Sequence, residues 1–145
     1  MWDVLDLPEG EVSSGSILSA ILKQGGRVTP WVETPVRPPM CPTAVIAVDR
    51  QRRPVLLAVA GRGLRELRAI AQAFRWMSEN RSLIAMALPQ FSIDTTITPA
   101  MRLLVDYADL TSDILQPMFE HGSVTVQAYR KLRWGPRTGL LLDAA

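Results

Sequence analysis

Two neighbouring segments of the chain are almost continuously apolar, and the segment after them repeats apolar residues at helical spacing. Residues 43–49 (TAVIAVD) and 54–60 (PVLLAVA) are separated by four residues, of which three are arginines. Short runs that are apolar on both faces are typical of strands in the middle of a sheet, covered on each side. Residues 63–80 carry apolar side chains three and four positions apart, which predicts an amphipathic helix.

These three segments predict a compact unit of hairpin and helix. The two apolar runs are expected to pair as antiparallel strands, because the polar link between them is short enough for a tight turn. The helix should pack on this hairpin through Leu67, Ile70 and Phe74, which share one helical face. Its opposite face is rich in arginine.

The remaining pattern predicts a mixed α/β chain in which elements of both types alternate. Pro30 and Pro35 each remove a backbone donor, so the segment that contains them is expected to be an edge strand. We expect a first helix at residues 13–26, that edge strand at 27–37 and a short helical or irregular stretch at 82–91. A buried strand should follow at 101–107, then a helix kinked by a proline at 109–122 and a closing hairpin at 123–142. We expect one α/β domain over residues 1–145, with residues 1–14 as an N-terminal extension.

Composition narrows the class of protein. The chain is 48% apolar, but no apolar run approaches the roughly 18–20 residues that span a bilayer, so no membrane partner is expected. The N-terminus is acidic and lacks the basic start of a signal peptide. Cys41 is the single cysteine, which excludes an internal disulfide and is typical of a reducing compartment. These features predict a cytoplasmic protein.

The net charge is only +2, but charge is distributed unevenly. Residues 50–75 hold seven arginines and one acid, Glu66, whereas residues 94–120 hold five acids and one arginine, Arg102. A basic segment of this kind permits nucleic-acid binding without requiring it. A solvated charged face is the alternative, and composition alone leaves both open.

The hairpin and the helix resemble parts of a known family. The stretch VIAVDRQRRPVLLAVAGRG (residues 45–63) resembles the metal-binding hairpin of the PD-(D/E)XK nuclease superfamily, and QAFRW (residues 72–76) resembles its Gln-x-x-x-Tyr helix motif, with Trp in place of Tyr. The later strands also follow in the order of bacterial members, so the resemblance spans residues 15–142. It implies the restriction-endonuclease-like fold, a central mixed β-sheet flanked by helices.

Aligned on the family pattern, this hairpin lacks the residues of the nuclease site. Asp49 matches the aspartate at the turn, whereas the first metal-binding aspartate, the metal-binding acid and the catalytic lysine fall on Ala44, Ala58 and Ala60. The resemblance gives Gln72 and Trp76 a supporting role. Carboxylates hold Mg²⁺ through oxygen, and the lysine stabilises charge on the phosphate, so alanine can do neither. No catalytic residue, metal ligand or cofactor is therefore expected as the chain stands.

Three alternatives to the natural loss of the site stay open. The register of the alignment could be wrong by a residue or two, although no lysine lies nearby to restore the site, since Lys23 and Lys131 are the two lysines of the chain. A carboxylate could have moved to a neighbouring element, with Glu33, Asp49 and Glu66 as candidates, although Asp49 is favoured as the cap of the turn. Alternatively, the alanines could be introduced substitutions in a working Mg²⁺-dependent deoxyribonuclease, since drift normally leaves a mixture of residue types.

Other candidate residues carry weaker signals. Arg62, Arg65, Arg68 and Arg75 could contact nucleic-acid phosphates, the first three together with backbone N–H groups of the glycine turn at residues 61–63. His121 near a helix end and Cys41 are expected to be structural. The tryptophans are expected to anchor the core or an interface, and these are Trp2, Trp31, Trp76 and Trp134.

The sequence thus predicts a catalytically silent nuclease-fold domain that serves as a nucleic-acid-binding or structural subunit. DNA or a protein assembly is the expected partner, and an oligomer is compatible with either. A metal-dependent DNA endonuclease, with a migrated or inactivated site and Mg²⁺ as its cofactor, is the alternative.

Overall fold

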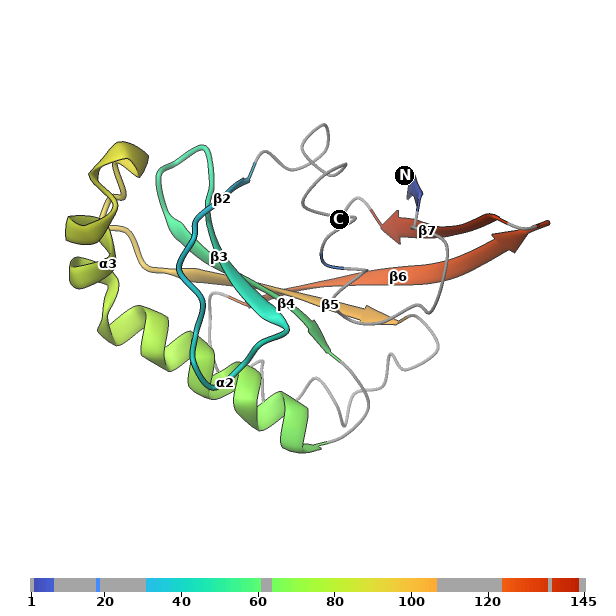
Figure 1. The fold of residues 1–145 in the computed structure, drawn as a ribbon, viewed down its shortest axis with the longest axis horizontal. Helices are drawn as coiled ribbons and strands as arrows, with labels where there is room; N and C mark the ends of the chain where they lie inside the picture. Colours follow the sequence, from blue (N-terminus) through green and yellow to red (C-terminus); the bar gives the residue numbers. More distant parts are fainter. Residues whose placement is uncertain are drawn as a thin grey trace.

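The structure of the chain is a computed structural model, shown in Figure 1. It describes residues 2–6, 18, 31–60, 64–106, 124–135 and 137–143. Two helices expected from the sequence, at residues 13–26 and 109–122, lie outside the described residues, except for Leu18, which is helical and buried.

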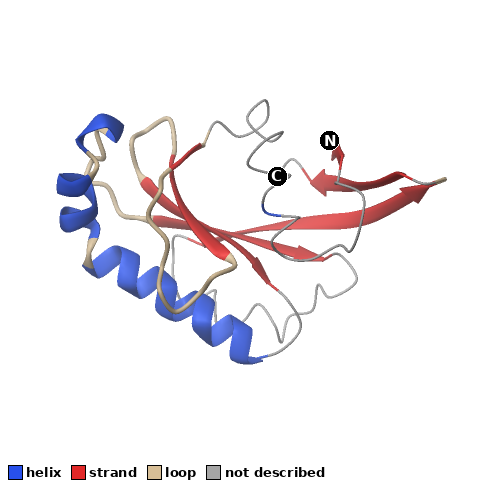
Figure 2. Cartoon of the chain, viewed as in Figure 1, coloured by secondary structure: helices blue, strands red, loops and turns tan. Residues whose placement is uncertain are grey.

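The described strands form one mixed sheet of seven, in the order β1-β7-β6-β5-β4-β3-β2. They are β1 (Trp2–Asp6), β2 (Val32–Glu33), β3 (Ala44–Val48), β4 (Pro54–Ala60), β5 (Ala100–Asp106), β6 (Val124–Trp134) and β7 (Arg137–Asp143). The pairs β4–β5 and β5–β6 are parallel, and the others are antiparallel. The helical elements are α2 (Leu64–Glu79), α3 (Arg81–Ala87) and the 3₁₀ helix η2 (Pro89–Phe91). They lie together at one side of the sheet, and the β6–β7 hairpin extends away from them (Figure 2).

The predicted central hairpin is confirmed. Ala44 pairs with Ala58 and Val48 pairs with Pro54, and every residue of β3 and β4 is buried. Pro54 is tolerated because it is the first residue of its strand, where a missing N–H costs little. Strands buried on both faces need a covering layer on each face of the sheet, and two separate apolar clusters provide these layers.

The turn of this hairpin is organised by one carboxylate. Asp49 Oδ1 accepts hydrogen bonds from the backbone N–H groups of Gln51 and Arg53, each at 2.9 Å, and Oδ2 accepts one from Arg53 Nε at 2.9 Å. Arg52 adopts a positive φ of 65°, a conformation that a non-glycine residue takes up only when neighbouring contacts hold it. The predicted role of Asp49 as the cap of the turn is confirmed.

One face of the hairpin packs against α2, as predicted. Leu67, Ile70 and Phe74 belong to the same buried cluster as Ile46 and Leu56. The opposite face of the sheet has its own core, in which the alternate residues of the same strands meet Leu18, Tyr129 and Leu140; they are Val45, Ala47, Val55, Leu57 and Val59.

Several elements differ in extent from the expected ones. Residues 27–30 of the expected edge strand lie outside the described residues, and of residues 31–37 only Val32–Glu33 form a strand, β2, at the edge of the sheet. Thr34 still donates its backbone N–H to Ile46 O at 2.9 Å, and Pro35, which has no N–H to donate, comes next. The stretch after α2 becomes α3 and then η2, which begins at Pro89. Residues 2–6, expected in an extension, form β1 and pair with β7, a contact that no local pattern indicates. None of the helices in the described part of the chain is long and apolar enough to cross a bilayer.

Removing side-chain volume between α2 and the sheet should destabilise the protein. Ile70 is 0% exposed, so Ile70→Ala is expected to lower the free energy of unfolding by about 2–5 kcal/mol, as measured by urea denaturation. Leu83→Ala is the control, because Leu83 on α3 is 64% exposed and its loss should change the free energy by less than about 0.5 kcal/mol. Equal effects would contradict the packing of α2 on the hairpin.

Changing Asp49 should separate the two kinds of hydrogen bond that it accepts. Asp49→Ala leaves two backbone N–H groups and Arg53 without their acceptor, and we expect a loss of about 1–3 kcal/mol in urea denaturation. Asp49→Asn keeps an oxygen for the backbone groups but removes the charge, so its loss should be smaller. If Asp49→Asn costs as much as Asp49→Ala, the contact with Arg53 dominates the turn.

Candidate functional site

The three alanines that the family resemblance aligns with nuclease residues lie together on one face of the hairpin. Ala44 is directly opposite Ala58 across the two strands, and Ala60 follows two residues later on the same face. Their exposed fractions are 0%, 0% and 5%, and all three belong to the cluster covered by α2. On β5 their neighbours are Leu103 and Val105, so their surroundings are apolar.

The residues expected to support that site do not both face it. Trp76 is half-buried and packs against the cluster that contains the alanines. Gln72 is exposed, since Ile70, Ala73 and Met77 occupy the inner face of α2. The structure therefore brings the three alanines and Trp76 into one core and leaves Gln72 outside it.

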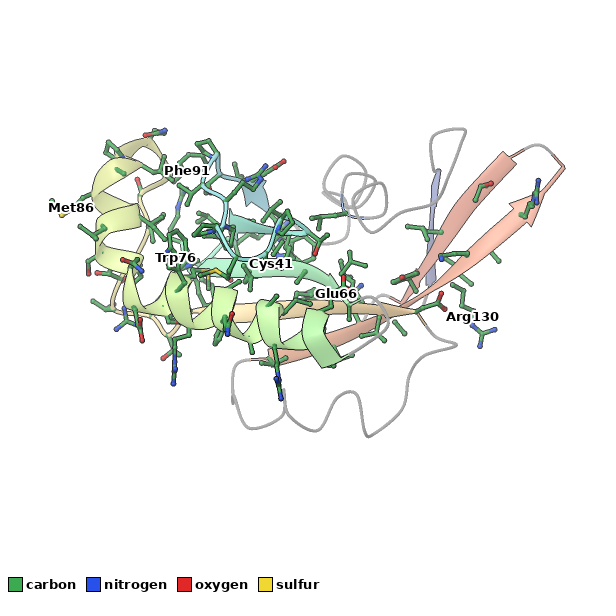
Figure 3. The ribbon with its side chains drawn as sticks, turned by 60° about the horizontal axis from the view of Figure 1, so that its bottom comes forward. Cys41, Glu66, Trp76, Met86, Phe91 and Arg130 are labelled. Atoms are coloured by element: carbon green, nitrogen blue, oxygen red, sulfur yellow. The ribbon has the colours of Figure 1, made fainter. Side chains whose placement is uncertain are left out.

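The carboxylates considered as migrated ligands lie on three different parts of the fold. Glu33 is exposed on β2 and forms an ion pair with Arg37. Asp49 is engaged in the turn, and Glu66 is half-buried in the first turn of α2 (Figure 3). Across the described residues, no three His, Cys, Asp or Glu side chains are grouped closely enough to hold a metal ion.

Two of the arginines predicted to contact phosphates, Arg68 and Arg75, lie on the outer face of α2. Arg68 and Arg75 are exposed, and Arg75 Nε lies 3.9 Å from Glu79 Oε1 in a pair whose side chains are both largely in solvent. Arg62 and the side chain of Arg65 lie outside the described residues. The described part of this surface thus presents Arg68, Gln72 and Arg75 along one stripe of the helix.

Some of the weaker candidate residues are described by the structure, and others lie outside the described residues. Cys41 is buried, with its sulfur 3.6 Å from Thr43 Oγ1, so it behaves as a small core residue (Figure 3). Trp31 lines a pocket on the far face of the sheet. His121, the glycine turn and the side chains of Trp2 and Trp134 lie outside the described residues.

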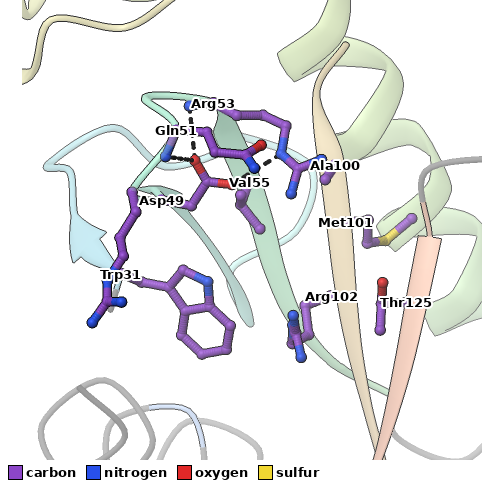
Figure 4. A pocket seen from close by; sticks show the side chains of 10 residues that line it. Trp31, Asp49, Gln51, Arg53, Val55, Ala100, Met101, Arg102 and Thr125 are labelled. Atoms are coloured by element: carbon purple, nitrogen blue, oxygen red, sulfur yellow. Dashed lines mark hydrogen bonds and ion pairs between the residues drawn. The ribbon is translucent and has the colours of Figure 1, made fainter. Parts of the chain in front are cut away.

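That pocket is a site that sequence reasoning did not identify. It has a volume of about 220 Å³ and lies where the β3–β4 turn meets the first residues of β4, β5 and β6 (Figure 4). Its polar lining includes three arginines and one acid, Arg50, Arg53, Arg102 and Asp49. The signal in the sequence is Arg102, a charge inside the otherwise apolar residues 100–105 of β5.

Arg102 is held by contacts from two other elements. Its guanidinium carbon lies 5.0 Å from the centroid of the Trp31 ring, within range of a cation–π interaction. Its Nη1 donates a hydrogen bond to Gln127 Oε1 on β6 at 3.3 Å. Burial lowers the pKa of Arg102, and the nearby positive charge of Arg53 lowers it further. The site is therefore a concentration of positive charge in partly desolvated surroundings.

Neither the protein-family models, nor the curated proteins, nor the solved structures contain a significant match to this chain. The function of the chain is therefore inferred from its own residues.

Proposed function

We propose that the chain is a non-catalytic binding domain of the PD-(D/E)XK type, in which core packing occupies the place of the metal site. The observation that carries this proposal is the burial of Ala44, Ala58 and Ala60 side by side beneath α2. The order of hairpin, helix and parallel strand in a mixed sheet supports the restriction-endonuclease-like fold that the sequence resemblance implies.

Burial favours an established structural role over recent loss of a working site. Removing three long polar side chains from an active site would leave a hollow open to water. Here Ala44 and Ala58 have no exposed surface, and the pocket with the arginines opens on the other face of the sheet. A charge placed among these apolar residues would cost several kcal/mol or be neutralised by a shift in its pKa.

The exposed stripe on α2 makes nucleic acid the preferred partner. Arg68, Gln72 and Arg75 lie three or four residues apart, so they project from one side of the helix. Arginine can bind a phosphate group through two parallel hydrogen bonds. The ion pair between Arg75 and Glu79 is long and exposed, so it is weak and would not prevent Arg75 from binding a phosphate. Contacts of this kind would bind the backbone without reading base sequence.

Restoring the nuclease residues should not restore a nuclease. We expect A44D/A58E/A60K to show no Mg²⁺-dependent DNA cleavage and to unfold at lower urea concentration, because the new side chains enter a dry core. Metal-dependent cleavage by the unmodified chain, or cleavage by the triple variant at full stability, would contradict the proposal.

The single change Ala58→Glu isolates the effect of charge. Ala58→Met is the matched control, since it overfills the same site without a charge and should cost about 1–3 kcal/mol. Ala58→Glu should cost more, on the order of 3–5 kcal/mol at neutral pH. Because burial raises the pKa of an introduced carboxyl, the folded state would keep a proton that the unfolded chain releases above about pH 4.3, so stability should fall as pH rises. A pH-independent cost would indicate that the introduced carboxyl reaches solvent.

Reversing charge on α2 should weaken binding to DNA of any sequence. We expect affinity for duplex DNA to fall steeply with salt, and R68E/R75E to reduce the slope of log K against log salt by about 1.8, because two phosphate contacts are lost. Arg37→Glu is the control, since Arg37 is exposed on a different segment and paired with Glu33. If both variants weaken DNA binding equally, α2 is not the DNA-binding surface. If DNA binding by the unmodified protein is too weak to measure even at low salt, a protein partner is favoured.

A further inference from the structure

We propose that the pocket between the β3–β4 turn and the first residues of β5 and β6 binds a phosphate-sized oxyanion. Three elements distant in the sequence converge there: Trp31 precedes β2, Arg53 ends the hairpin turn, and Arg102 lies on β5 (Figure 4). This site is on the face of the sheet opposite α2, so the inference does not rest on the proposed function.

The net positive charge of the pocket favours an anionic ligand. Three arginines and one aspartate line it, which leaves an excess of two positive charges. The aspartate is already engaged, because its two oxygens accept hydrogen bonds from two backbone N–H groups and from Arg53. Arg53 and Arg102 are close enough to repel one another, and an anion of two charges placed between them would offset that repulsion.

Arg102 is positioned before any ligand arrives. Trp31 packs against its guanidinium and Gln127, itself 1% exposed, accepts one of its hydrogen bonds. A side chain fixed in this way loses little conformational entropy on binding, which favours affinity. Thr125 lies opposite Arg102 on β6, and its exposed side chain adds a hydroxyl donor to the wall of the pocket.

The size of the pocket limits how much of a ligand it can enclose. Its volume of about 220 Å³ is below the roughly 300–1,000 Å³ of sites that enclose drug-sized molecules. A phosphate group fits inside the pocket with room to spare, whereas a whole nucleotide would extend beyond it. The ligand is therefore a free phosphate, or the phosphate end of a larger molecule such as a nucleic acid.

Titration with inorganic phosphate tests the site directly. Isothermal titration calorimetry at constant ionic strength, with chloride replacing phosphate, should show saturable binding to the unmodified protein. Arg102→Gln should raise the dissociation constant about tenfold or more, because a charge-assisted contact is lost. Arg50→Gln should do the same, and since Arg50 is exposed on the turn, this variant is expected to fold even if Arg102→Gln does not.

Arg75→Gln is the matched control, because it removes an exposed arginine from the other face of the sheet. Unchanged phosphate binding by this variant, together with weakened binding by Arg50→Gln, supports the site. Absence of saturable binding to the unmodified protein, or equal weakening by Arg50→Gln and Arg75→Gln, would overturn it.

Short oligonucleotides distinguish the two sources of phosphate. A 5′-phosphorylated tetranucleotide that competes with inorganic phosphate more strongly than its 5′-hydroxyl counterpart indicates the end of a nucleic acid. Inorganic phosphate that binds as well as the phosphorylated oligonucleotide indicates a free anion. R68E/R75E should leave phosphate titration unchanged even if it abolishes binding to duplex DNA, so failure of the α2 interface and failure of this site are separable.

Discussion

The burial of the β3–β4 hairpin on both faces is the constraint on which the structure depends. Every residue of these two strands is buried, and apolar strands of this kind require a covering layer on each side. The inner face of α2 supplies one layer. Leu18, Tyr129 and Leu140 contribute to the other.

This constraint also determines where polar chemistry can occur. The face under α2 is dry, and Ala44 and Ala58 are fully buried in the apolar cluster that this face shares with the helix. Metal ligands at these positions would need water or partner charges, and an apolar core provides neither; it would instead raise the pKa of a carboxyl placed there and keep it neutral. Polar groups gather instead at the turn, where Asp49 satisfies backbone donors and arginines border a pocket.

The folded chain divides the basic segment into two separate surfaces. Along the sequence the arginines of residues 50–75 form one group, but the pocket beside the turn and the outer face of α2 lie on different sides of the sheet. Arg102, from the acidic part of the chain, joins the arginines at the turn. The two surfaces differ in kind, since the stripe on α2 is open to solvent and Arg102 is partly enclosed.

Local periodicity was sufficient for the elements that depend on near neighbours. The two hairpins and the inner face of α2 follow from apolar spacing and short turns, because these interactions join residues close in sequence. The strand β5 is predicted by its own apolar run, although its partners on β4 and β6 are distant in sequence. Contacts between distant segments decided the rest. β1 is a strand because β7 offers it an edge, and the pocket exists because Trp31, Arg53 and Arg102 meet only when the sheet is assembled. The sequence alone shows alanine at positions 44, 58 and 60, but whether these residues line an open site or a packed core depends on the cover that α2 gives the sheet.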